Sequence, residues 1–96
     1  MSICRIIETP ATPEQYDQIR ARLGVDENNP PPGGKVHIAA KGEDGKVRIV
    51  EVWDSREQAE AWGEKVRAVR EELGVGGGAE PTITYLEVLQ FMTAKA

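Results

Sequence analysis

The chain has one cysteine, one histidine and no long apolar run. Because Cys4 has no second cysteine to pair with, an internal disulfide and a cysteine-rich zinc site are both excluded. No stretch approaches the roughly 18 apolar residues that a membrane-spanning helix needs. The N-terminus also lacks the basic-then-apolar layout of a secretion signal. These absences predict a cytoplasmic protein that does not associate with membranes.

An excess of basic residues is also missing. Lys and Arg number 12 against 16 Asp and Glu, so the formal net charge is −4. A general nucleic-acid binder needs a basic face, so no nucleic-acid partner is expected. With 40% hydrophobic and 29% charged residues, the 96-residue chain has the composition of a folded protein, and its length fits one domain spanning residues 1–96.

The order of the expected elements predicts the fold. Thr12, Pro13 and Gly24 mark the start and stop of a first helix, whose apolar stripe includes Tyr16. Strands are expected over residues 3–7, 35–41, 46–53 and 82–91, and a second helix between Ser55 and Gly74. This βαββαβ order is typical of a ferredoxin-like α+β fold, with a four-stranded antiparallel sheet and two helices on one face.

The segment Asn28–Gly34 is rich in proline and glycine, has no periodicity and is predicted to be a loop. It is longer than the 2–6 residues or so that usually join a helix to a strand. Because it leads directly into the strand that carries His37, we expect it to border the mouth of a pocket.

Alternation along the strands divides the side chains between two sheet faces. The face expected under the helices carries Val36, Ile38, Ala40, Val50, Val52, Leu86 and Val88. The second face carries Ile3, Arg5, Ile7, His37, Ala39, Ile49, Glu51, Trp53, Ile83, Tyr85, Glu87, Leu89 and Phe91. No segment remains to cover this second face, although it includes large apolar side chains. We therefore expect a homodimer that associates through it and encloses a cavity for a small hydrophobic ligand.

His37 is the leading candidate for acid–base chemistry, because an imidazole titrates near neutral pH. If opposite residues of the hairpin sum to 88, Glu51 faces His37 and can orient it as a general base. A slip of one residue would place Val50 there instead. The alternatives are a structural histidine and a Glu51 carboxylate that forms a salt bridge to Arg5.

Further candidates share the second face. Tyr85 is a candidate catalytic residue that would hydrogen-bond a substrate oxygen, with an interface tyrosine as the alternative. Substrate-binding candidates are Arg5, Ile49, Trp53 and Glu87. Arg5 would clamp an anionic oxygen or form an ion pair, and Trp53 would line the pocket or pack in the core.

Three segments carry a family resemblance: Pro31–Gly34, Val36–Ala40 and Val50–Glu57. Together they resemble the dimeric α+β barrel superfamily, in particular small proteins related to the antibiotic biosynthesis monooxygenases. The resemblance implies a homodimer whose two sheets form a barrel, with a pocket in each subunit. It also implies a small cofactor-independent enzyme that oxygenates, cyclises or isomerises an aromatic or polyketide-like substrate by proton transfer.

The alternative function is a non-catalytic, ligand-binding or structural homodimer, since fold alone does not determine activity. Members of the superfamily that degrade haem carry an iron-binding histidine on the second helix and an asparagine on the first strand. Here the matching helix position is Trp62 and the first strand has no asparagine. No cofactor and no metal are therefore expected.

Overall fold

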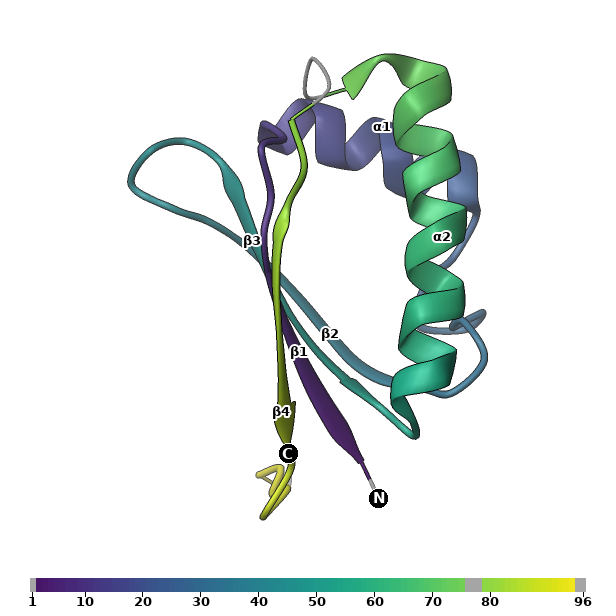
Figure 1. Ribbon diagram of the computed structural model, residues 1–96, viewed down its shortest axis with the longest axis vertical. Helices are drawn as coiled ribbons and strands as arrows, with labels where there is room; N and C mark the ends of the chain where they lie inside the picture. Colours follow the sequence, from purple (N-terminus) through teal and green to yellow (C-terminus); the bar gives the residue numbers. More distant parts are fainter. Residues whose placement is uncertain (1, 76–78, 95–96) are drawn as a thin grey trace.

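A computed structural model describes residues 2–75 and 79–94. The elements follow the order β1 (Ile3–Glu8), α1 (Pro13–Leu23), β2 (Gly34–Lys41), β3 (Val47–Trp53), α2 (Arg56–Leu73) and β4 (Thr82–Glu87). The four strands form one antiparallel sheet in the order β2-β3-β1-β4. Both helices lie on the same side of this sheet (Figure 1). The predicted ferredoxin-like α+β fold is confirmed.

The helices begin and end where the sequence predicts, because their end residues satisfy free backbone groups. The Thr12 hydroxyl accepts from the Gln15 amide, and the Gln15 side chain accepts from the Thr12 amide. Ser55 caps α2 in the same way with its hydroxyl. Gly24 and Gly74 end the two helices in the left-handed conformation, at φ of 69° and 68°, which glycine adopts without strain.

The last strand is shorter than predicted. β4 ends at Glu87, whereas the sequence pattern predicts a strand to residue 91. Glu87 pairs with Ile3, the first residue of β1, and one more backbone hydrogen bond follows, from the Val88 amide to the Ser2 carbonyl at 3.1 Å. Leu89 and Phe91 consequently lie outside the sheet and are exposed.

The two sheet faces are the reverse of the sequence expectation. Arg5 Nη1 donates to the Ala59 carbonyl of α2 at 2.6 Å, and His37 contacts Tyr16 of α1. The face carrying Arg5 and His37 therefore lies beneath the helices, and the predicted homodimer interface through that face is wrong. The opposite face, which neither helix covers, carries Val36, Ile38, Ala40, Val50, Val52 and Leu86, of which Val52 is buried at 8% exposed.

The wrong assignment has a physical reason. Both faces are largely apolar, and the sequence pattern places the charged residues on the open face. Arg5 and Glu51 instead neutralise each other, which allows both to be buried. On the uncovered face Ile38 is 54% exposed and Leu86 48% exposed.

The interior has an apolar part and a polar part. Ala11, Ile19 and Val75 form a buried cluster, and residues of both helices pack against it: Leu23, Val66 and Val69. The polar part, made by buried Arg5, Glu51 and Trp53, lies between the sheet and α2. Among the described residues, no helix is both long enough and apolar enough to cross a membrane.

Candidate functional site

Glu51 is the centre of a buried hydrogen-bond network. It lies on β3, opposite Arg5 on β1 and opposite His37 on β2. Its Oε1 accepts from Arg5 Nε at 2.9 Å, Arg5 Nη2 at 2.7 Å and Trp53 Nε1 at 3.0 Å. Its Oε2 lies 2.8 Å from His37 Nδ1. Of the two registers that the sequence leaves open, the structure has the one in which opposite residues sum to 88, and the His37–Glu51 contact forms.

These partners keep Glu51 ionised. Burial by itself would raise the pKa of its carboxyl. The hydrogen bond from His37, the positive charge of Arg5 and the hydrogen bond from Trp53 outweigh that effect and hold the pKa below its ordinary value of 4.5. At neutral pH the carboxylate can therefore only accept hydrogen bonds.

The carboxylate fixes the arrangement of the imidazole. Because Glu51 only accepts, the hydrogen of neutral His37 must be on Nδ1, which leaves Nε2 as an acceptor. Nε2 lies 2.6 Å from the hydroxyl oxygen of Tyr16. The two rings are nearly parallel, at 11°. Both nitrogens of His37 thus have partners, although 45% of its side chain is exposed.

Tyr16 is the member of this site that the sequence reasoning missed. The sequence predicts it only as part of the apolar stripe of the first helix, and its ring does face the sheet. Burial raises the pKa of its hydroxyl above the usual 10; the charges of Glu51 and Asp17 raise it too, while Arg20 opposes them. The sequence offers one general indication of this role. A tyrosine on a helix face that points into the protein usually needs a hydrogen-bond partner for its hydroxyl.

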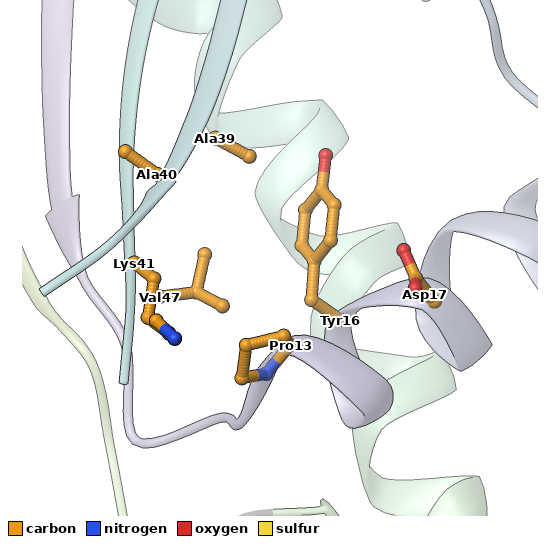
Figure 2. A pocket seen from close by; sticks show the side chains of 7 residues that line it. All are labelled: Pro13, Tyr16, Asp17, Ala39, Ala40, Lys41 and Val47. Atoms are coloured by element: carbon orange, nitrogen blue, oxygen red, sulfur yellow. The ribbon is translucent and has the colours of Figure 1, made fainter. Parts of the chain in front are cut away.

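A shallow pocket adjoins Tyr16, between the start of α1 and the hairpin end of β2 and β3 (Figure 2). Its volume is about 230 Å³, and its lining residues are Pro13, Tyr16, Asp17, Ala39, Ala40, Lys41 and Val47. This volume is below the range of roughly 300–1,000 Å³ typical of drug-sized ligands. The pocket therefore suits a compact molecule with one ring. Its walls are mainly apolar, with the Tyr16 ring on one side.

Arg5 and Trp53 do not line this pocket. They are 2% and 1% exposed and both donate to Glu51, so their contacts are with the network rather than with a ligand. Ile49 pairs with pocket residue Ala39 across β2 and β3 but is not itself part of the lining.

Tyr85 and Glu87 lie on β4, at the opposite edge of the sheet from His37. Three strand spacings of about 4.8 Å separate β4 from β2, or about 14 Å. The Arg56 guanidinium lies over the Tyr85 ring, 4.1 Å from its centroid. The structure therefore does not bring Tyr85 together with His37.

The loop Asn28–Gly34 also lies away from the pocket. The Gly33 carbonyl accepts from the Asp54 amide at 2.8 Å, which holds the loop near the start of α2. The pocket is at the other end of β2, and no loop residue lines it. The expectation that this loop borders the pocket is wrong for this pocket. Within residues 2–75 and 79–94, no three His, Cys, Asp or Glu side chains are grouped so that they could hold a metal ion.

No protein-family model matches the chain, and no curated protein matches it. Solved structures with the same fold do match. A Caulobacter crescentus protein, provisionally named an antibiotic biosynthesis monooxygenase, is 17% identical, with 93% of this chain and 91% of that chain covered and a TM-score of 0.67. A Nitrosomonas europaea protein of unknown function is 14% identical, with 99% and 96% covered and a TM-score of 0.70.

A Chloroflexus aurantiacus protein with the same provisional monooxygenase name is 24% identical, with 97% and 100% covered and a TM-score of 0.56. These similarities span nearly the whole chain. They confirm the resemblance to antibiotic biosynthesis monooxygenase-like proteins at the level of the fold.

Proposed function

We propose that this protein is a small enzyme that transfers protons on a compact aromatic or other hydrophobic substrate. The observation that carries the proposal is the 2.8 Å contact between His37 Nδ1 and Glu51 Oε2. It is the arrangement of a general base with an orienting carboxylate. The Glu51 carboxylate fixes the tautomer and stabilises the imidazolium that forms when His37 takes up a proton.

Proton transfer limits the class of reaction. An isomerisation or a cyclisation moves protons within one substrate and needs no redox group. Oxygenation would also consume dioxygen, and the substrate itself would have to supply the electrons as a carbanion. Within this range the provisional names of the structural neighbours favour oxygenation, and the pocket of about 230 Å³ favours a compact substrate.

We also propose that the protein is a homodimer that associates through the uncovered sheet face. Three large apolar side chains on that face are exposed in the single chain: Ile38 at 54%, Val50 at 36% and Leu86 at 48%. Exposed apolar side chains gathered on one sheet face are typical of an interface. The buried Arg5–Glu51 network is on the other side of the sheet, so each subunit would keep its own site.

A hydrogen–deuterium exchange assay tests the catalytic proposal without knowledge of the natural substrate. An aryl 1,3-diketone is placed in deuterium oxide, and loss of its acidic C–H signal is followed by proton NMR. The protein should accelerate this exchange, and His37→Gln should abolish the acceleration. Lys35→Gln, two residues away on the same strand, is the matched control and should exchange like the wild type.

Two results would count against this function. No acceleration by the wild type, together with binding of the diketone, would favour the alternative of a non-catalytic ligand-binding protein. Full acceleration by His37→Gln would show that His37 is a structural residue.

A further inference from the structure

We propose that Tyr16 is the catalytic residue that contacts the substrate and takes its proton first, and that the pocket takes monocyclic phenols or enols. This inference rests on the proposed function and adds the group that His37 works through. Tyr16 is on α1, far from His37 in the sequence, and reaches it across the space between helix and sheet.

Both ring nitrogens of the His37 imidazole have partners within the protein. His37 Nδ1 contacts Glu51 Oε2 at 2.8 Å and Nε2 contacts the Tyr16 hydroxyl at 2.6 Å. An imidazole has only these two nitrogens, so none is left for a substrate. A proton that reaches His37 must therefore pass through Tyr16 unless this contact breaks.

Tyr16 lies where it can contact both His37 and a molecule in the pocket. Its ring forms a wall of the pocket, and its hydroxyl lies toward the Ala39 end of that pocket (Figure 2). When Tyr16 donates to Nε2, the lone pairs of its oxygen remain free to accept a hydrogen bond. A substrate hydroxyl in the pocket is the donor that fits this acceptor. The raised pKa of Tyr16 is consistent with a residue that stays protonated and relays protons rather than resting as a phenolate.

The proton movements balance without a further reactant. The substrate O–H bond breaks and an O–H bond forms on Tyr16, while the original Tyr16 O–H bond breaks and an N–H bond forms on His37 Nε2. The electron pair stays on the substrate oxygen, which becomes a phenolate or an enolate. The imidazolium lies beside the Glu51 carboxylate, and returning the proton to a substrate carbon gives the keto tautomer.

The charged groups at the pocket suit a substrate that enters neutral. Asp17 and Lys41 both line the pocket, one acidic and one basic. For a ligand that is already an anion, Asp17 repels it and Lys41 attracts it. A neutral phenol or enol avoids repulsion from Asp17 on entry, and Lys41 is available to the anion that forms afterwards.

The test uses 4-nitrophenol, whose anion is coloured, at a pH about one unit below its pKa in water. Binding to the wild type should raise the ionised fraction of the probe several-fold. Tyr16→Phe should remove this increase while keeping the apolar wall of the pocket. Tyr85→Phe makes the same chemical change at the opposite sheet edge and should behave like the wild type.

The variants separate this inference from the proposed function. If His37→Gln loses the increase and Tyr16→Phe keeps it, the inference is overturned and the general base stands. If both keep it, the inference and the proposed function fail together. If the wild type does not ionise the probe, the inference is overturned.

A second measurement needs no variant. With tyrosines labelled with carbon-13 at the hydroxyl-bearing carbon, the Tyr16 signal should shift on addition of 4-nitrophenol and the Tyr85 signal should not. A shift confined to Tyr85, or no shift at saturating probe, would overturn the inference.

Discussion

Arg5 and Glu51 lie directly opposite each other on neighbouring strands, and two nitrogens of the Arg5 guanidinium donate to the same carboxylate oxygen. The third guanidinium nitrogen donates to the Ala59 carbonyl of α2. Arg5 therefore links the middle of the sheet to the helix that covers it, and also holds the carboxylate that orients His37.

We predict that Arg5→Met destabilises the fold strongly. Removal of one partner leaves the buried Glu51 carboxylate with too little positive charge, which typically costs about 3–5 kcal/mol. The control is Arg67→Met, because Arg67 forms an exposed ion pair with Glu71. That pair should contribute less than about 1 kcal/mol. Urea denaturation measures both, and equal effects of the two substitutions would contradict the prediction.

Gly63 on α2 gives a second test of how Arg5 packs between the sheet and this helix. A Cβ added at Gly63 would lie 3.2 Å from Arg5 Nη1, closer than an ordinary contact. Gly63→Ala in the wild type should therefore lower the free energy of unfolding by displacing the guanidinium. In the Arg5→Met background the same change should stabilise α2 by about 0.5–1 kcal/mol, the usual preference of a helix for alanine. A double-mutant cycle measures the difference, and the same sign in both backgrounds would exclude this explanation.

The lowered pKa of Glu51 predicts how stability depends on pH. A carboxyl that releases its proton more readily when folded stabilises the fold above its ordinary pKa of 4.5. That contribution is lost as the pH falls through the lower pKa of the folded state. The free energy of unfolding should therefore fall more steeply below pH 4.5 in the wild type than in Glu51→Gln. Glu60→Gln, at an exposed ion pair, should keep the wild-type slope.

The proposed dimer predicts a change in molecular mass on substitution of the uncovered face. Leu86→Glu places a charge on that face, where Leu86 is 48% exposed in the single chain, so the subunit should still fold. Sedimentation velocity should show a dimer for the wild type and a monomer for Leu86→Glu. The control is Leu73→Glu on α2, where Leu73 is 38% exposed, and it should remain dimeric. A monomeric wild type at micromolar concentration would contradict the proposal.

Local signals in the sequence are sufficient for the order of the elements and for the presence of the β2–β3 hairpin. Thr12 and Ser55 cap helices through contacts within three residues, and the short connection from Gly42 to Gly45 fixes the register of the hairpin. The His37–Glu51 contact follows from one of the two hairpin registers that the sequence leaves open. These features depend on near neighbours, which a single sequence records.

The features that the sequence did not predict correctly depend on contacts between distant segments. Which sheet face the helices cover depends on Arg5 reaching Ala59, 54 residues away in the chain. Tyr16 joins the site only because α1 lies over the edge strand β2. Tyr85 shares a sheet face with His37, but the strand order separates them, and alternation does not report strand order.

His37 belongs to an outermost strand, whereas Glu51 and Arg5 belong to the two central strands. The buried Arg5–Glu51 pair therefore lies in the centre of the sheet, where substitutions destabilise the fold most. The pocket is lined by residues at the edge of the sheet and at the start of α1. Changes at Pro13, Asp17 and residues 39–41 can reshape the pocket while Tyr16 and the buried ion pair stay in place. A fold arranged in this way can acquire a new substrate through changes in the pocket lining while it keeps the same proton-transfer residues.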